Sequence, residues 1–250
     1  MQSLEHQRVV ITGGSRGLGL GVVEALVARR AEVVVVARDA DRLAALERRL
    51  GVTVISGDIT ERALADKVVR EISPNVVILN AGAPPAMAPL HEQTWESFTA
   101  IWDHDVRAGF HWIQAALRTP LGRGGRVLIT SSGAAVAGSP LSGGLAGAKR
   151  MLWLMAKYAN GVAAELDLGV RFQALVPLQI IGDTEHGRIA AGAYARKKGI
   201  AVEAFLAGFG RSMPPRQYGE HVVAILTDPA YDSAGALGMK GDTGIQILEG

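Results

Sequence analysis

The run Val9–Gly19 constrains the fold more than any other part of this chain. It reads Val-Val-Ile-Thr-Gly-Gly-Ser-Arg-Gly-Leu-Gly, and a helical pattern over Leu20–Arg30 follows. A strand, a glycine turn and a helix together present backbone N–H groups and the positive end of a helix dipole to a phosphate. Glycine also removes the Cβ atoms that would block close approach of the ligand. The run therefore predicts a phosphate-binding turn; the alternative is an ordinary strand-to-helix connection.

Short apolar runs alternate with helical patterns along the rest of the chain. Most runs are continuous, which is typical of parallel strands buried on both faces. The alternation predicts one doubly wound Rossmann-type α/β domain over residues 1–250, with an about seven-stranded parallel sheet and helices on both faces. The predicted strands are Arg8–Thr12, Glu32–Ala37, Val52–Ser56, Asn75–Asn80, Gly125–Thr130, Arg171–Val176 and Gly244–Leu248.

Side chains that accept hydrogen bonds from first-turn N–H groups mark where further helices begin. Asp39, Thr60 and Thr94 are the predicted N-caps. The helices that this pattern predicts are Ala40–Leu50, Glu61–Ile72, a long helix after Thr94 that reaches Leu117, and a second long helix over Leu145–Leu168.

The segment Leu178–Pro215 breaks the alternation. It contains two amphipathic pieces, about Glu185–Lys198 and Val202–Arg211. Ligands of open α/β sheets bind outside the carboxyl ends of the strands. An insertion around residues 178–215, after the sixth predicted strand, is therefore expected to form a substrate lid, and the alternative is a surface elaboration.

Composition excludes several classes of function. The 26 Lys and Arg residues nearly balance the 24 Asp and Glu residues without forming a basic run, so no nucleic acid is expected as a partner. The chain has no cysteine, which excludes disulfides, thiolate metal sites and cysteine nucleophiles, and no His/Asp/Glu spacing suggests a metal site. No apolar stretch approaches the ~18 residues of a membrane span, and the polar N-terminus lacks a signal core, so a cytoplasmic protein is expected.

Motifs stand at four of the predicted strand ends. Together, over essentially the whole chain, they resemble those of the short-chain dehydrogenase/reductase family. The resemblance implies that Asp58 accepts from the adenine amino group and that Ile59 packs on its ring. The alternative for Asp58 is a helix-capping acid before Thr60, and the two roles can coexist. The motifs are Thr12-Gly13-Gly14-Ser15-Arg16-Gly17-Leu18-Gly19, Gly57-Asp58-Ile59-Thr60, Asn80-Ala81-Gly82 and Ile129-Thr130-Ser131-Ser132. The implied cofactor-binding residues are Gly13, Ser15, Arg16, Gly17, Leu18, Gly19, Arg38, Asp58, Ile59, Asn80, Ala81, Gly82, Lys149 and Pro177.

Charge favours one nicotinamide cofactor over the other. An acidic residue at the tip of the second strand would bind the ribose hydroxyls of NAD and repel a 2′-phosphate. Here Arg38 ends that strand, although Asp39 follows, and Arg16 lies where the family places a basic residue when it prefers NADP. Two guanidinium groups suit a phosphate, so NADP(H) is favoured over NAD(H). The alternative is two solvated arginines and an NAD enzyme.

The residues for proton chemistry depart from the family pattern. The family usually carries Ser, then Tyr thirteen residues later, then Lys four residues after that. Counted from Ser132, these positions hold Leu145 and Lys149, so the lysine is in register and the tyrosine is a leucine. Asp105 stands where the family's helix asparagine usually lies. It is expected to pair with Lys149 as a replacement relay, and the alternatives are a local cap, a structural buried ion pair or a helix kink.

The residues that usually contact the nicotinamide, after the sixth strand, also depart from the family pattern. Pro177-Leu178 replaces the usual Pro-Gly, and Thr184 lies two positions beyond the common threonine spacing. The residues that hint at an apolar or aromatic substrate are Met87, Trp102, Trp112 and Trp153, although the last two also fit core or dimer contacts.

These residues favour an NADP(H)-dependent oxidoreductase that reduces a ketone or a quinone-like or aromatic substrate without the tyrosine. Ser132, Lys149 and Asp105 are its expected catalytic residues. Water, the substrate itself, or a lid side chain such as Tyr194 or His186 would supply the proton. The alternative is a catalytically degenerate NADP(H)-binding protein that acts as a sensor or subunit partner. The apolar surfaces of the two long helices predict a homodimer or homotetramer.

Overall fold

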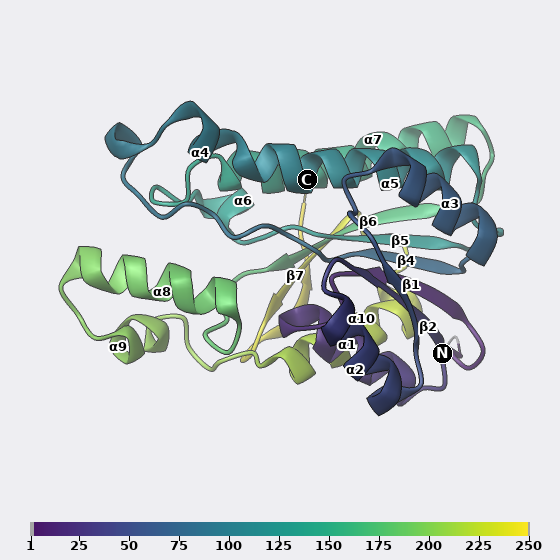
Figure 1. The fold of residues 1–250 in the computed structure, drawn as a ribbon, viewed down its shortest axis with the longest axis horizontal. Helices are drawn as coiled ribbons and strands as arrows, with labels where there is room; N and C mark the ends of the chain where they lie inside the picture. The colour runs from purple at the N-terminus through teal and green to yellow at the C-terminus, as the bar shows by residue number, and fades with distance from the viewer. Residues whose placement is uncertain (1–2, 250) are drawn as a thin grey trace.

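A mostly parallel sheet forms the centre of the computed structural model, which describes residues 3–249 (Figure 1). Its order is β3-β2-β1-β4-β5-β6-β7-β8, with only the last pair antiparallel among the described strands. The continuous apolar runs of β4 and β5 are buried throughout, as expected for strands covered on both faces. The strands are β1 (Arg8–Thr12), β2 (Glu32–Ala37), β3 (Thr53–Ser56), β4 (Val76–Leu79), β5 (Arg126–Thr130), β6 (Arg171–Pro177), β7 (Ala236–Lys240) and β8 (Gly244–Ile247).

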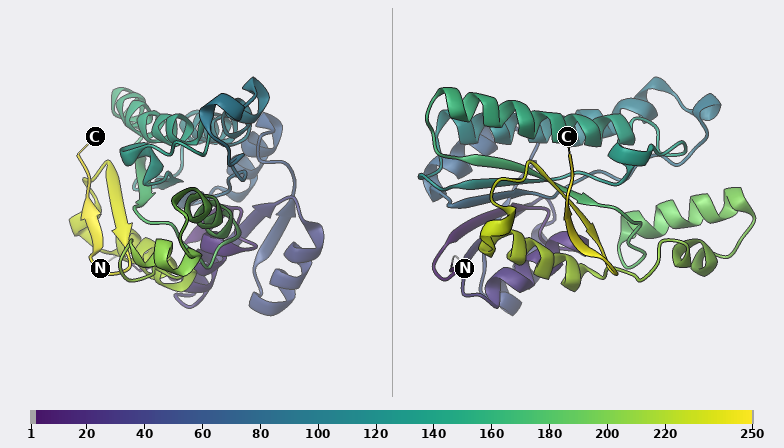
Figure 2. Two further views of the ribbon diagram at one scale, coloured as in Figure 1. Left: turned by 90° about the vertical axis from the view of Figure 1, so that its left-hand side faces the viewer. Right: turned by 180° about the vertical axis from the view of Figure 1, so that it is seen from behind.

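Helices cover both faces of the sheet. One layer contains α1 (Gly17–Val27), α2 (Ala40–Leu50) and α10 (Pro215–Thr227), and the other contains α3 (Arg62–Ile72), α5 (Arg107–Arg118) and α7 (Leu145–Glu165) (Figure 1). The remaining helices are α4 (Trp95–Ile101), α6 (Ala134–Ala137), α8 (Glu185–Lys198) and α9 (Val202–Ala207). Of these, α8 and α9 extend away from the sheet on the side where α4 and α6 lie (Figure 2).

The predicted fold class is confirmed, with one strand misplaced. The seventh parallel strand is β7, which sequence reasoning missed, and the predicted strand Gly244–Leu248 is the antiparallel β8. The sequence of β7, Ala-Leu-Gly-Met-Lys, has no β-branched residue and carries Gly238 at its centre, so its strand pattern is weak. A Cβ on Gly238 would lie 2.7 Å from Leu178 Cδ1, so close packing explains the glycine.

Some predicted helix limits are wrong. Helix α1 begins at Gly17 rather than Leu20, directly from the glycine turn. Thr60 does not cap α3, because the helix begins at Arg62 with Glu61 at the N-cap position. The backbone N–H and the hydroxyl of Thr60 instead donate to Asp58 Oδ1, each at 2.9 Å. The predicted long helix after Thr94 is interrupted by a π-helical segment, Trp102–Val106, between α4 and α5.

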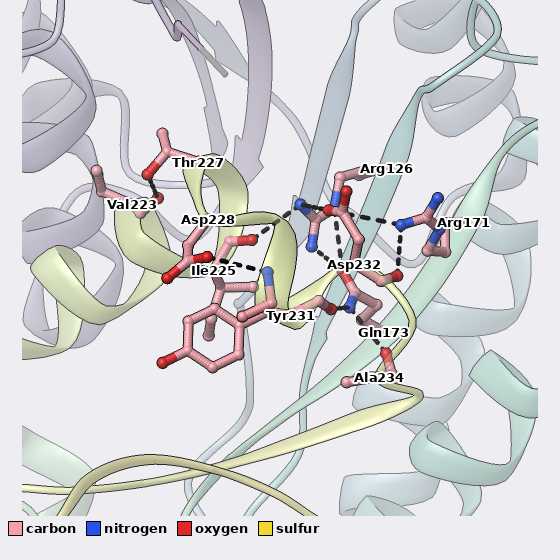
Figure 3. A network of polar contacts seen from close by, with 11 residues as sticks. Arg126, Arg171, Gln173, Val223, Ile225, Thr227, Asp228, Tyr231, Asp232 and Ala234 are labelled. Carbon is pink, nitrogen blue, oxygen red and sulfur yellow. Dashed lines mark hydrogen bonds and ion pairs between the residues drawn. The ribbon is translucent and has the colours of Figure 1, made fainter. Parts of the chain in front are cut away.

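A buried arginine ties the C-terminal part of the chain to the sheet (Figure 3). Arg126, at the amino end of β5, donates to the carbonyl of Ile225 at 2.8 Å and to Asp232 Oδ1 at 3.2 Å. Its Nε donates to Gln173 Oε1 on β6 at 3.0 Å. Burial lowers the pKa of Arg126 to about 10, although Asp232 opposes that shift. The network lies at the end of β5 opposite Ser131 and Ser132, so it serves the scaffold.

Candidate functional site

A cavity of about 1340 Å³ lies along the carboxyl ends of the parallel strands, under the 178–215 segment. Pockets for single drug-sized ligands typically measure about 300–1,000 Å³, so this one has room for a dinucleotide and a second molecule. It brings together most residues assigned from the sequence to cofactor or catalysis. Those that line it are Gly13, Ser15, Arg16, Gly17, Leu18, Arg38, Ile59, Asn80, Ala81, Gly82, Asp105, Ser132, Leu145, Lys149 and Pro177.

The glycine turn is shaped so that the phosphates of a ligand can approach the backbone of the turn closely. Gly13 has φ +69°, and a Cβ there would lie 2.7 Å from Ala81 Cα. Gly19 packs behind the turn, where a Cβ would lie 2.2 Å from the carbonyl oxygen of Gly13. Asn80 braces the turn by donating from Nδ2 to that carbonyl at 3.2 Å. The cradle therefore fits a dinucleotide pyrophosphate at the N-terminus of α1.

Basic side chains gather at the adenosine end of the cavity. Arg16, Arg38 and Arg42 line it together with Asp39. The carboxylate of Asp39 is committed locally, since it caps α2 at the Arg42 N–H (3.0 Å) and pairs with Arg42 Nε (3.0 Å). Arg16 forms an ion pair with Glu185, the first residue of α8. The corner thus carries more positive than negative charge.

The contact of Asp58 with adenine stays a prediction, and in the structure Asp58 binds a neighbouring residue. Its side chain binds Thr60, and within the described residues Asp58 does not line the cavity, whereas the neighbouring Ile59 does. The hydrogen bond from the Thr60 N–H lowers the pKa of Asp58, with burial opposing it and Arg38 contributing to the lowering.

Asp105 and Lys149 form a buried ion pair. Asp105 Oδ2 lies 2.9 Å from Lys149 Nζ, with the two side chains 1% and 10% exposed. Asp105 Oδ1 accepts from the Ala83 N–H at 2.8 Å and lies 2.8 Å from His104 Nδ1. Burial favours the neutral acid, but Lys149, His104 and the Ala83 N–H outweigh burial and hold the pKa of Asp105 below its ordinary value. The carboxylate therefore offsets the charge of the lysine.

The backbone around this pair comes from β5 and α7. Lys149 Nζ donates to the carbonyl of Thr130 at 3.3 Å, and Ser131 Oγ donates to the carbonyl of Lys149 at 2.8 Å. Ser132 faces the cavity, and its hydroxyl accepts from the Ala134 N–H at 3.2 Å. Leu145 lines the cavity one helical turn before Lys149, at the position where the family usually has tyrosine.

The apolar part of the cavity differs from the sequence-based expectation. Within residues 3–249 it is lined by none of the four residues that hinted at an aromatic substrate, Met87, Trp102, Trp112 and Trp153. Aromatic rings come instead from the 178–215 segment. Tyr194 stacks on Phe205 at 5.8 Å between ring centroids, and Phe205 meets Phe209 edge-on at 5.4 Å. All three line the cavity.

Two titratable side chains of α8 also line the cavity. Tyr194 Oη lies 2.7 Å from Ser139 Oγ and accepts from the Leu141 N–H at 3.2 Å. Burial, helped by the charges of Lys149 and Arg16, lowers the pKa of His186, while Asp105 and Glu185 oppose the shift. Thr184, assigned to the nicotinamide amide, uses its hydroxyl to cap α8 at the Gly187 N–H at 3.0 Å.

Sequence reasoning missed two residues at this site. His104 lines the cavity and contacts Asp105. Its only signal was adjacency to Asp105. Glu185 was not singled out at all, because no local pattern links it to Arg16, 169 residues earlier.

The arrangement provides an anion cradle, a buried ammonium–carboxylate pair and a hydroxyl facing one cavity. Over residues 3–249 no group of three or more His, Asp and Glu side chains could hold a metal ion. None of the described helices is both long and apolar enough to cross a membrane.

Known proteins share this architecture. A family model described as "short chain dehydrogenase" matches residues 7–186. The chain is 24% identical to galactitol 2-dehydrogenase of Agrobacterium fabrum (strain C58 / ATCC 33970) over 219 residues, covering 84% of each chain. It is 33% identical to cis-2,3-dihydrobiphenyl-2,3-diol dehydrogenase of Pseudomonas putida over 142 residues, 52% of this chain and 51% of the relative. A solved short-chain type dehydrogenase/reductase from Mycobacterium ulcerans has a TM-score of 0.80 at 23% identity, covering 95% of this chain and 89% of its own.

Proposed function

The chain belongs to the short-chain dehydrogenase/reductase family, and from this premise we propose that it is an NADP(H)-dependent oxidoreductase acting without an active-site tyrosine. The family implies a nicotinamide cofactor. The observation that carries the proposal is that Ser132 and Lys149 line the same cavity as the glycine turn at Gly13–Leu18. Groups that could act on a substrate oxygen therefore share one space with the cofactor cradle.

The preference for NADP(H) rests on the adenosine end of the cavity. Arg16 and Arg38 both line it, and the carboxylate of Asp39 is already used by the N-terminus of α2 and by Arg42. Guanidinium groups bind a phosphate through charge-assisted hydrogen bonds. A 2′-phosphate would find donors there rather than a free carboxylate.

Four residues of the chain would bind the cofactor and the substrate and shape the site. When bound, a reduced nicotinamide cofactor supplies a hydride to the carbonyl carbon of the substrate. Ser132 donates a hydrogen bond to the substrate oxygen, and Lys149 holds the ribose of the cofactor. A water molecule between these two side chains, or an acidic proton of the substrate itself, protonates the oxygen. Asp105 holds the ammonium of Lys149 in place, and Leu145 excludes water from one wall.

The substrate is a ketone or a quinone-like compound with an apolar or aromatic body. Tyr194, Phe205 and Phe209 support this class, since rings on the 178–215 segment, from here on the lid, line the cavity. Val136, on the opposite wall, is 60% exposed and also lines it. Flat apolar rings stack well on such walls.

The second candidate is a catalytically degenerate NADP(H)-binding protein that acts as a sensor or subunit partner. One observation favours it: the lysine is paired with Asp105, and an apolar side chain, Leu145, stands where a proton donor is expected. Under this candidate the same cofactor binds, but no carbonyl compound is reduced.

Exposed apolar side chains on α5 and α7 support a homodimer or homotetramer. They include Phe110 on α5, Tyr158 on α7 and, directly after α7, Leu166, and these side chains are buried only if another molecule covers them. Light scattering on the purified protein tests this assembly, and a monomer at micromolar concentration would count against it.

Two measurements test the function. We expect NADPH to bind more tightly than NADH, and Arg38→Ala to weaken NADPH binding about tenfold or more while sparing NADH. Arg48→Ala, an exposed change elsewhere on α2, serves as the control. NADPH oxidation is then measured with a panel of ketones, quinones and polycyclic aromatic carbonyls. Tighter NADH binding would reject the cofactor assignment, and tight NADPH binding without turnover on the panel would favour the second candidate.

A further inference from the structure

An ion pair joins the lid to the glycine turn. Arg16 lies within the turn, Glu185 is the first residue of α8, and their side chains are 50% and 49% exposed. The N-cap residue of α8 also lies close to the turn, since a Cβ on Gly17 would lie 3.7 Å from Thr184 Cγ2. The N-termini of α1 and α8 therefore meet at the cofactor cradle.

A second contact holds the lid at the substrate end. The hydroxyl of Tyr194, in the third turn of α8, lies 2.7 Å from Ser139 Oγ and accepts from the Leu141 N–H at 3.2 Å. Both contacts span the cavity, but they differ in kind. The contact at Tyr194 is neutral, whereas the contact at Glu185 uses a guanidinium that the proposed function assigns to a cofactor phosphate.

We propose that Glu185 competes with the 2′-phosphate of the cofactor for Arg16, so that Glu185 sets the affinity for phosphorylated cofactor and couples its binding to the lid. This inference rests on the proposed function. A guanidinium offers its paired donors to one anion at a time, and a carboxylate at the same corner repels a phosphate dianion. Binding of the phosphate therefore releases α8 from the glycine turn.

The competing explanation is that Glu185 only stabilises its own helix. A carboxylate in the first turn interacts favourably with the helix dipole, wherever its side chain points. The two roles differ in their consequence for nucleotides: helix stabilisation is indifferent to the 2′-phosphate, whereas competition for Arg16 is not. Asp183 offers a matched control, because it is an exposed acid two residues before Glu185.

The experiment compares Glu185→Gln with Asp183→Asn. Adenosine 2′,5′-bisphosphate and 5′-ADP are titrated by calorimetry at constant ionic strength. We expect E185Q to bind the bisphosphate about three- to fivefold more tightly than the original protein, the size of an exposed ion pair, with less than a twofold change for 5′-ADP. D183N changes neither value by as much as twofold. Equal changes for both nucleotides in E185Q, or no change, would overturn the competition.

Amide hydrogen exchange of residues 185–198 reports on the lid separately. We expect faster exchange in ligand-free E185Q than in the original protein, and faster exchange in the original protein once the bisphosphate is added. Exchange unaffected by E185Q would overturn the coupling to the lid. If the original protein binds 5′-ADP as tightly as the bisphosphate, the NADP(H) preference fails, and the E185Q exchange rate still decides whether the ion pair holds α8.

The reciprocal charge swap completes the test. Arg16→Glu combined with Glu185→Arg restores an ion pair at this position without an arginine in the glycine turn. We expect the double variant to recover slow exchange in α8 but to lose its preference for the bisphosphate over 5′-ADP. Failure to recover slow exchange, when either single variant exchanges fast, would contradict a direct ionic contact.

Discussion

The carboxylate of Asp105 lies 2.9 Å from the ammonium of Lys149, one helical turn beyond Leu145. In a site with a tyrosine at position 145, an uncompensated lysine would stabilise the tyrosinate and lower the pKa of the phenol. Here the lysine has its own counter-charge and its neighbour has no proton to give. A leucine at position 145 and a counter-charge on the lysine are therefore compatible features of one site.

Restoring the tyrosine tests this relationship. We expect Leu145→Tyr to raise kcat/KM for simple ketones with NADPH about tenfold or more, where a well-positioned general acid typically supplies ~10²–10⁴-fold. Adding Asp105→Asn should raise it further and lower the pKa seen in the pH profile of kcat/KM, since the lysine charge then acts on the phenol. Leu145→Phe fills the same space without a hydroxyl, so an equal gain in that variant would contradict proton donation.

The ion pair should also contribute to stability. Asp105→Ala leaves the Lys149 ammonium buried without a counter-charge, and we expect the free energy of unfolding to fall by about 3–5 kcal/mol. Asp105→Asn combined with Lys149→Met removes both charges and should lose less than Asp105→Ala alone. Urea unfolding followed by circular dichroism measures each value, and a double variant less stable than Asp105→Ala would contradict the charge argument.

The carboxylate of Asp105 should also make the free energy of unfolding depend on pH. The pKa of Asp105 in the folded protein lies below its ordinary value of 3.8, so its contribution is present above pH 3.8. It is lost as pH falls through the lower folded value. We therefore expect the urea midpoint of the Asp105→Asn variant to fall less than that of the original protein between about pH 5 and pH 3.

His186 predicts a second pH effect, of a different origin. Burial holds its pKa below 6.5 in the folded protein, so the unfolded chain binds this proton more readily. Stability should fall as pH drops from 6.5 toward the folded value, and His186→Gln should make that fall shallower. Thermal unfolding across this window measures it. His91→Gln, an exposed change, is the control, and an equal flattening there would sink the assignment to His186.

The buried arginine on β5 makes a prediction about the scaffold. Asp232→Ala removes the carboxylate that faces Arg126, and we expect the free energy of unfolding to fall by about 2 kcal/mol. Arg171→Gln, which removes the half-exposed partner of the same carboxylate, should cost less than about 1 kcal/mol. Chemical denaturation of both variants measures these free energies of unfolding. A larger loss for Arg171→Gln would mean that the surface ion pair contributes more to stability than the buried one.

Most of the fold could be predicted because its signals are local. The glycine turn from Gly13 to Gly19 and the buried runs of β1, β2, β4, β5 and β6 each carry their own pattern. The strand β7 could not, because Gly238 and the lack of β-branched residues weaken its pattern, and its place depends on pairing with β6. Tertiary contacts, rather than the local sequence pattern, determine that this segment forms a strand.

The candidate site was predictable in part for the same reason. The spacing from Leu145 to Lys149 predicts that both lie on one face of a helix. The contact between Asp105 and Lys149 was among the open alternatives, because Asp105 stands where the family's helix asparagine usually lies. The pairing of Arg16 with Glu185 was not foreseeable, because it joins segments 169 residues apart through a lid whose course no local pattern specifies. Thr60 does not cap α3 because the helix begins at Arg62, one residue later than expected, which leaves Glu61 at the N-cap position.

The π-helical segment Trp102–Val106 means that the phase of a helix, and not only the residue at position 105, selects the partner of Lys149. A π-turn accommodates one more residue than an α-turn. Deleting a residue just after Asp105 and closing the segment to α-helix would rotate Asp105 about 100° around the axis relative to α5. The carboxylate of Asp105 would then move away from Lys149, although residue 105 itself was not substituted. Insertions and deletions here would therefore alter the site as point substitutions do elsewhere.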